Sequence, residues 1–278
     1  MSIPLALGAP AAPRTYQLTT TSLVRMNEAE ERNTFRTTAR LTLLERKPNN
    51  TYRLALEVLR FEAENPTFFN SLAADLNQVS NSLVIQTDVY GRLERIENKA
   101  EMLRTWQHIR AGVVKKYQSY YPPAFFDAFG QAIQAEGVFE KTLRHKGLHG
   151  VLLAGLHGYG YAPDAPVRGT RVLEQFINQV SLPLQTTTTV APDAAPGQLR
   201  LAVVGALHHA ALQEDDLRRL FRTMADNPLL KVQLQATCQE QYHLEAATGW
   251  LLQAEQRLTA EVPGIYSNDV HHRLETIA

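Results

Sequence analysis

The chain has 278 residues, of which 44% are hydrophobic and 20% are charged, as in ordinary globular proteins with a substantial core. Lys and Arg together number 28, as do Asp and Glu, so the formal net charge is zero. Because a neutral chain lacks the basic excess that neutralises phosphates, we expect no nucleic acid among its partners. The single cysteine, Cys238, excludes an intrachain disulfide.

Residues 1–13, "MSIPLALGAPAAP", are predicted to form an N-terminal tail. They are apolar, but they carry no basic region and no apolar run long enough for a signal peptide. No stretch of the chain approaches the roughly 20 apolar residues that span a bilayer, so we expect no transmembrane segment. These features favour a cytoplasmic protein, with a periplasmic location as the alternative if a signal peptide was trimmed or mis-annotated.

Residues 14–98 are predicted to form a first β-rich half. Residues 14–26 are rich in Thr and Tyr and predict a strand. Residues 33–47 and 51–63 alternate apolar and polar side chains, as antiparallel strands with one solvated face do. Asn65, a good N-cap, and Pro66 at the first helical position then predict a helix that ends near Gln78.

The segment "LVIQTDVYGRLERIEN", Leu83 to Asn98, is predicted to complete this half as a hairpin. Asp88 suits the first position of a type I turn, and Gly91 suits the left-handed position that closes it. The pattern therefore predicts two antiparallel strands that reverse near Gly91.

A helical insert is expected at 99–180. Apolar residues at helical spacing predict one helix after Asn98 and a second after Pro123. The second helix carries a Phe-rich stripe, a possible hydrophobic ligand or packing surface: Phe125, Phe126, Phe129 and Ile133. The Gly- and His-rich stretch 143–166 predicts irregular structure, and 169–180 predicts a short helix.

Residues 181–278 are predicted to form a second β-rich half. A strand, a helix and a long hairpin that turns at Thr248 and Gly249 occur within 197–262, in the same order as within 51–98. One such unit has a single apolar sheet face, which it cannot bury alone. We therefore predict an α+β fold, in which curved antiparallel sheets from two pseudo-repeated strand-helix-hairpin units and the helical insert form one integrated domain.

The Gly- and His-rich stretch is the richest candidate for chemistry. His145 and His149 are four residues apart, as in half of a metal site on a helix, but Gly147 and Gly150 weaken any helix there. The stretch is more typical of a loop that packs closely on the sheet. We expect no metal and no cofactor, and a possible contact loop formed by His145, His149, His157, Tyr159 and Tyr161.

Catalytic motifs are missing from the sequence. No Gly-x-Ser-x-Gly elbow is present, and the spacing of Gly155, Gly158 and Gly160 fits neither the dinucleotide fingerprint nor the P-loop. Cys238 is expected to be a half-buried strand residue. We expect no catalytic residue and no enzyme, and an enzyme that uses His145 or His149 is the remaining option of that class.

Two segments carry a resemblance to a known kind of protein: "TDVYGRLERIENKAEMLRTWQHI" and "YHLEAATGWLLQAEQRL". Both resemble an uncharacterised group of bacterial β-rich proteins, many of them secreted or lipoproteins, and are similar in style to the half-barrels of lipoprotein carriers. The resemblance covers about a third of the chain, and its motifs mark turns. It implies a fold and no functional residue. We expect the chain to depart from the group, because residues 1–13 do not predict a signal sequence and contain no lipobox cysteine.

Two functions follow as hypotheses. The first is a non-catalytic structural or adaptor subunit of a bacterial multiprotein assembly, whose edge strands pair with other protein subunits or with a second copy of the chain. The alternative is a carrier or binder of a hydrophobic small molecule or lipid in a curved-sheet cavity. A cavity that faces Phe125, Phe126 and Phe129 would favour the carrier, and a solid core with exposed edges would favour the subunit.

Overall fold

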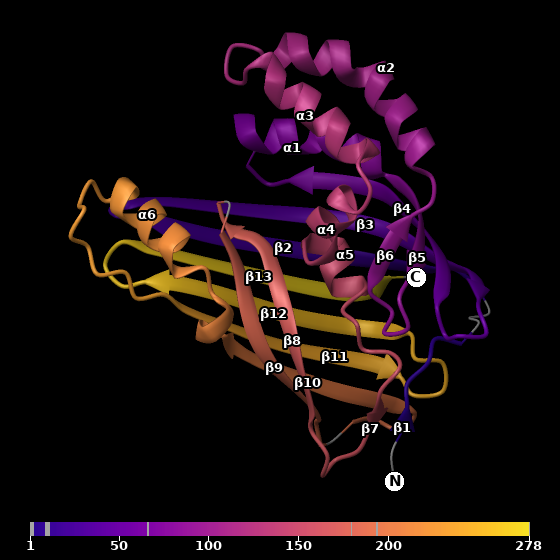
Figure 1. Ribbon diagram of the computed structural model, residues 1–278. Coiled ribbons are helices and arrows are strands. Elements are labelled where there is room, and N and C mark those ends of the chain that lie inside the picture. Colours follow the sequence, from indigo (N-terminus) through magenta and orange to yellow (C-terminus); the bar gives the residue numbers. More distant parts are fainter. Residues whose placement is uncertain (1–2, 9–11, 66, 179, 193, 278) are drawn as a thin grey trace. The chain divides into compact units, whose positions relative to one another are not determined.

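A computed structural model describes residues 3–8, 12–65, 67–178, 180–192 and 194–277. The fold is α+β, with an antiparallel sheet of 11 strands, a separate two-stranded sheet of β1 and β7, and helices (Figure 1). Hydrogen-bonded neighbours in the large sheet follow the order β6-β5-β4-β3-β2-β13-β12-β11-β10-β9-β8.

The strands have the following bounds: β1 Ile3–Pro4, β2 Arg14–Met26, β3 Ala29–Arg46, β4 Tyr52–Ala63, β5 Ser82–Thr87, β6 Leu93–Ile96, β7 Gly160–Tyr161, β8 Val167–Ile177, β9 Val180–Val190, β10 Gln198–Leu207, β11 Gln235–Glu245, β12 Leu251–Val262 and β13 Tyr266–Ile277. The α-helices are α1 Phe68–Asn77, α2 Lys99–Tyr117, α3 Pro123–Gln134, α4 Val138–Arg144, α5 Gly147–Leu152 and α6 Glu214–Met224. Two short 3-10 helices are η1 Gln78–Ser80 and η2 His209–Ala211.

The chain divides into two compact units. Unit 1 comprises Met1–Leu5, Thr19–Thr34 and Tyr159–Glu275. Unit 2 comprises Ala6–Leu18, Phe35–Gly158 and Thr276–Ala278. The expected N-terminal tail contributes one buried leucine to each unit, Leu5 to unit 1 and Leu7 to unit 2. Residues 1, 2 and 9–11 lie outside the described part of the chain.

In unit 2 the sheet forms as its alternation predicts. Tyr52, Leu54 and Leu56 of β4 are buried on one face, and Leu54 pairs with the equally buried Ile85 of β5. Helix α4 covers the edge strand β6. Its Glu140 accepts a hydrogen bond from the Ile96 amide at 3.2 Å, and its Arg144 donates to the Leu93 carbonyl at 2.9 Å. Side chains thus satisfy edge groups that would otherwise be open to another strand.

The turn between β5 and β6 confirms the hairpin prediction. The Asp88 carboxylate accepts hydrogen bonds from the amides of Tyr90 (2.9 Å) and Arg92 (2.8 Å), and Gly91 has φ +83°. The Gly-rich loop packs against this turn, because a Cβ on Gly91 would lie 2.4 Å from Nδ1 of His157. A side chain at Gly91 therefore meets both backbone strain and a steric clash.

In unit 1 the sheet curls so that its edge strand β8 lies against the inner face of β11 to β13. Arg171 of β8 donates two hydrogen bonds to Glu240 of β11, although β9 and β10 separate these strands in the sheet order. Asn268 of β13 donates to the Phe176 carbonyl of β8 at 3.4 Å. Figure 1 shows β8 crossing in front of the strands it contacts. In a flat sheet, the usual strand spacing would place β8 and β11 about 14 Å apart. The hydrogen bonds between Arg171 and Glu240 therefore indicate that the sheet is curled.

The curled sheet of unit 1 encloses an apolar core. Helix α6 packs Leu217 and Phe221 onto it, beside strand residues such as Leu184, Leu258 and Val262. The first turn of α6 holds Glu214, Asp215 and Asp216 and its last turn holds Arg222, a charge order that suits the helix dipole.

The pseudo-repeat predicted from the sequence is confirmed. In both copies a helix connects two neighbouring antiparallel strands, and the second of these strands forms a hairpin: β4-α1-β5-β6 and β10-α6-β11-β12. The second hairpin is longer, and it reverses at Gly249 (φ +65°) as expected.

Three local predictions are corrected. The segment 169–180 is not a helix: residues up to Ile177 belong to β8, where Val172 is 40% exposed and Leu173 is buried, as alternation requires. Thr67, rather than Asn65, caps α1, because its hydroxyl accepts the Asn70 amide at 3.2 Å, and Pro66 lies outside the described residues. The stretch 143–166, expected to be irregular, contains α5.

The two glycines Gly91 and Gly112 provide a matched pair of substitutions. Gly91→Ala is expected to lower the free energy of unfolding by more than about 1 kcal/mol, because the residue has positive φ and a Cβ meets His157. Gly112→Ala in α2, where a Cβ meets nothing within 4 Å, is expected to raise it by about 0.5–1 kcal/mol. Urea unfolding measures both, and equal effects of the two substitutions would contradict the assignment.

Candidate functional site

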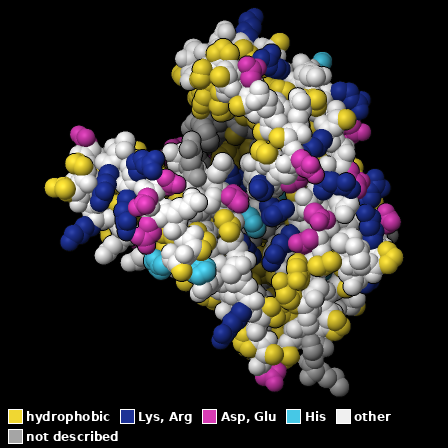
Figure 2. Space-filling model, in the orientation of Figure 1, with side chains coloured by type: hydrophobic (Ala, Val, Ile, Leu, Met, Phe, Trp, Pro, Cys, Tyr) yellow, Lys and Arg dark blue, Asp and Glu magenta, His cyan; other side chains and the backbone are white. Residues whose placement is uncertain are grey.

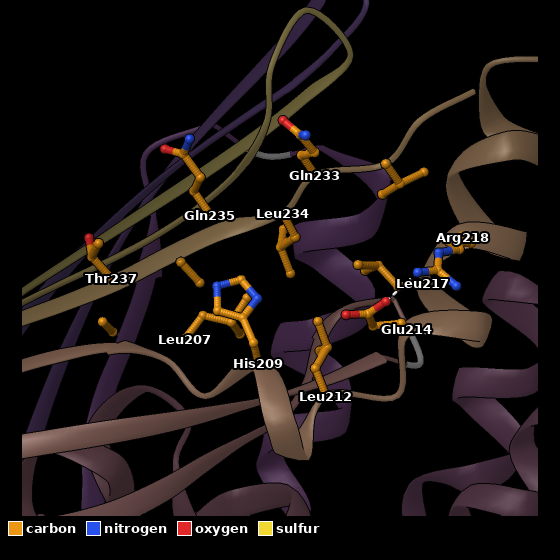
Figure 3. A pocket seen from close by; sticks show the side chains of 13 residues that line it. Leu207, His209, Leu212, Glu214, Leu217, Arg218, Gln233, Leu234, Gln235 and Thr237 are labelled. Carbon is orange, nitrogen blue, oxygen red and sulfur yellow. Dashed lines mark hydrogen bonds and ion pairs between the residues drawn. The ribbon is translucent and has the colours of Figure 1, made fainter.

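The strongest candidate site is a pocket beside α6 in unit 1, which we call the α6 pocket. It has a volume of about 530 Å³ and lies between α6, the end of β10 and the segment that leads into β11. Leu207, Leu217 and Leu234 form a buried floor. Figure 3 shows the His209 ring among the side chains of Leu207, Leu212 and Leu234.

The mouth of the α6 pocket is polar. Glu214, Arg218, Gln233, Gln235 and Thr237 line it together with His209. Arg218 pairs with Glu214, the contact dashed in Figure 3, and with Asp215 at 3.3 Å. These ion pairs are exposed and stabilise the fold little, about 0.5 kcal/mol each, but they hold the guanidinium at the rim. The pocket is thus apolar inside and hydrogen-bonding at its opening.

Behind the pocket, β11 carries a buried polar network. Glu240 is 2% exposed and accepts hydrogen bonds from Arg171 and, at 2.8 Å, from the Tyr242 hydroxyl. Gln256 of β12 in turn donates to the Tyr242 hydroxyl at 2.7 Å. Burial opposes the charge of Arg171, but the carboxylate of Glu240 raises the pKa of Arg171, so the guanidinium stays charged.

Cys238 lies on the same strand and is fully buried, more deeply than the half-buried position expected. Burial, and secondarily the charge of Glu240, raises the pKa of its thiol to about 12. The thiol is therefore protonated at neutral pH and is a poor nucleophile. Its sulfur packs against Gly205, where a Cβ would lie 2.7 Å from Sγ.

Substitutions in the buried ion pair test how β8 is held. Arg171→Met leaves the Glu240 carboxylate buried without its partner, and we expect it to cost about 3–5 kcal/mol of unfolding free energy. The double variant Arg171→Met/Glu240→Leu is expected to recover most of that loss. Chemical denaturation of these two variants and of the single variant Glu240→Leu measures the coupling, and additive effects of the two single substitutions would contradict a direct pair.

The Phe-rich stripe lies in unit 2. Phe126 and Ile133 are fully buried, and Phe129 packs between Trp106 and Phe139 with ring centroids 4.9 and 6.2 Å away. Phe125 is 36% exposed. Three of the four residues thus pack within the helical part of unit 2, and Phe125 reaches the surface.

Of the residues of the expected contact loop, Tyr159 and Tyr161 belong to unit 1, with ring centroids 6.1 Å apart, and His145, His149 and His157 belong to unit 2. His145 caps the end of α4, and His149 is buried in α5. His157 meets the Tyr52 ring edge-on at 5.6 Å. Tyr161 is buried in β7, and Tyr159 is partly exposed. Within the described ranges, no three His, Cys, Asp or Glu side chains are grouped so that they could hold a metal ion.

Two buried histidines make stability depend on pH. Burial lowers the pKa of His149 and of His272 from 6.5 to about 4. Because the unfolded chain binds these protons at higher pH than the folded chain, the stability present above pH 6.5 is lost as the pH falls towards 4. Each histidine is expected to contribute about 3 kcal/mol to this loss. Unfolding of His149→Gln across this range should show a shallower pH dependence, and an unchanged slope would contradict the assignment.

The sequence did not predict the α6 pocket. Its walls come from a strand end, a helix and a connecting segment, and each of these has ordinary local patterning. The only local signal was the amphipathic helix that begins "EDDLRRLF", with His209 shortly before it.

Comparison with known proteins places the chain in no family. No protein-family model matches the sequence, and no curated protein matches it. One similar solved structure is described as "Lipid-protein interactions in lipovitellin"; it has a TM-score of 0.49 and 10% identity over 96% of this chain, which spans 25% of the lipovitellin chain. Another is DynF from the dynemicin biosynthesis pathway of Micromonospora chersina, with a TM-score of 0.21 and 7% identity over 99% of this chain and 84% of that one. No helix in the described part of the chain is long and apolar enough to cross a membrane.

Proposed function

We propose that the protein is a non-catalytic binder of a small amphipathic molecule, which it holds in the α6 pocket. The observation that carries this proposal is the combination of a leucine floor with a hydrogen-bonding rim in a volume of about 530 Å³. Pockets that hold small molecules typically measure about 300–1,000 Å³, with apolar walls and a few polar groups that orient the ligand. The ligand's apolar portion contacts Leu207, Leu217 and Leu234, and its polar group lies at the mouth.

The charged groups at the rim support binding rather than chemistry. Glu214 and Asp215 are engaged by Arg218, and Asp216 pairs with Arg219 at 3.2 Å. A general acid or base must lie within hydrogen-bond distance of the substrate atom that gains or loses the proton. These carboxylates instead form ion pairs with arginines. The nearby thiol of Cys238 is protonated and buried.

A substitution that fills the mouth tests the proposal. Ala206 lines the α6 pocket and is exposed, so Ala206→Trp adds bulk to the opening without disturbing the core. The probe is 1-anilinonaphthalene-8-sulfonate, a small molecule with an apolar body and an anionic group. We expect Ala206→Trp to weaken its binding about tenfold or more, as measured by fluorescence titration.

Val204→Trp is the matched control for this test. Val204 lies two residues earlier on β10, on the same face as Ala206, and is 61% exposed, but it does not line the pocket. Val204→Trp is therefore expected to leave the affinity for 1-anilinonaphthalene-8-sulfonate unchanged. Equal affinity of the wild type and Ala206→Trp, or equal losses in both variants, would refute the proposal.

The assembly-subunit function expected from the sequence stays a prediction. The feature that supports it is β8, which is the last strand in the sheet order and exposes Val172. Backbone pairing along such an edge is a common way for a partner strand to bind. Protein subunits that co-purify in native mass spectrometry would favour this function.

A further inference from the structure

A cluster of aromatic rings lies where α2 ends and α3 begins. We call it the aromatic tip and define it as Phe68, Tyr117, Tyr120, Tyr121 and Phe125. Tyr120 is 68% exposed and Phe125 is 36% exposed, whereas Tyr117 is fully buried. Figure 2 shows hydrophobic side chains at the surface of the helical part of unit 2. The cluster therefore runs from the core to the solvent.

The rings of the tip are held in place by one another. The Phe68 ring lies 3.9 Å from that of Tyr120 and 6.2 Å from that of Tyr121, and Tyr121 stacks on Phe125 at 4.7 Å (centroid distances). Pro122 and Pro123 restrict the backbone between the two helices. Binding through these rings would consequently cost little additional conformational entropy.

The buried end of the tip anchors it by hydrogen bonds. The Tyr117 hydroxyl donates to Asp75 of α1 at 2.7 Å, and Lys116 donates to the same carboxylate oxygen at 2.8 Å. The tip is thereby fixed to α1 as well as to α2.

Charged side chains of α2 lie near the tip in sequence. Arg110 pairs with Asp127 at 2.6 Å and Lys116 pairs with Asp75, so two cations and two carboxylates cancel. Lys115 is exposed, and none of the described residues forms an ion pair with it. The surface thus combines exposed aromatic rings, tyrosine hydroxyls and the exposed ammonium group of Lys115.

We propose that the aromatic tip docks on a membrane surface that contains anionic lipids. Tyrosine rings favour the boundary between headgroups and acyl chains, because one end of the ring is apolar and the other can hydrogen-bond. The Lys115 ammonium complements lipid phosphates and extends on a flexible stem towards them. A neutral bilayer would attract the aromatic rings but not the Lys115 ammonium, so this exposed ammonium favours an anionic surface. The proposal does not depend on the α6 pocket.

Vesicle co-sedimentation of the full chain tests this proposal. The vesicles contain phosphatidylcholine alone or phosphatidylcholine with phosphatidylglycerol. The wild type is expected to bind the anionic vesicles more strongly, and Tyr120→Ser/Phe125→Ser is expected to lower its partition coefficient about tenfold or more. Lys115→Glu should reduce binding to the anionic vesicles about fivefold or more and leave binding to neutral ones nearly unchanged.

The control variant is Leu229→Ser, which removes an 86% exposed apolar side chain in unit 1 and should bind as the wild type does. A second measurement does not depend on loss of binding. Tyr120→Trp is expected to shift its fluorescence to the blue when anionic vesicles are added, because the new indole enters the interface.

Three outcomes would overturn the proposal. They are failure of the wild type to bind either vesicle, equal binding by the Tyr120→Ser/Phe125→Ser variant, and a fluorescence spectrum of Tyr120→Trp that vesicles leave unchanged. Concentration-dependent dimerisation of the wild type that the double variant abolishes, without vesicle binding, would assign the tip to a second copy of the chain instead.

Discussion

The buried ion pair between Arg171 and Glu240 is the interaction on which the architecture of unit 1 depends. It joins a strand at the sheet edge to one three positions away in the strand order, so it can form only if the sheet curls. Two charges taken out of water require good geometry and further hydrogen bonds, and here Tyr242 supplies one of them. The pair therefore holds β8 against β11, and Leu173 and Ile177 of β8 belong to the apolar core on which α6 packs.

The α6 pocket follows from this arrangement. Helix α6 buries only Leu217 and Phe221 of its eleven residues, and most of its remaining length is charged. The pocket lies where α6 adjoins the end of β10, and the buried side chains of Leu207, Leu217 and Leu234 line it. The corresponding helix of the other copy, α1, is held differently, since its Asp75 is bound by Lys116 and Tyr117 of α2. The same strand-helix-hairpin pattern thus produces a pocket in one unit and an anchored helical surface in the other.

Features fixed by local chemistry could be predicted from the sequence. The alternation at Tyr52, Leu54 and Leu56 and the turn at Gly91 depend on neighbouring residues, and both predictions are confirmed. The segment that forms β8 was mistaken for a helix because Val172, Leu173, Phe176 and Ile177 fall at helical spacing. β9 follows it directly, with Ile177 paired to Val180, and its contact with Glu240 is long-range; helical periodicity carries no information about either. The α6 pocket was missed for the same reason, since its walls come from separate segments.

The most direct test of the binding account is leucine-methyl NMR of the full chain during titration with 1-anilinonaphthalene-8-sulfonate. If the α6 pocket is the binding site, the largest saturable shifts belong to Leu207, Leu212, Leu217 and Leu234, which line it. Leu72 and Leu103 in unit 2 should shift little. Saturable shifts centred on the leucines of unit 2, or no saturable shifts at any leucine, would contradict the account.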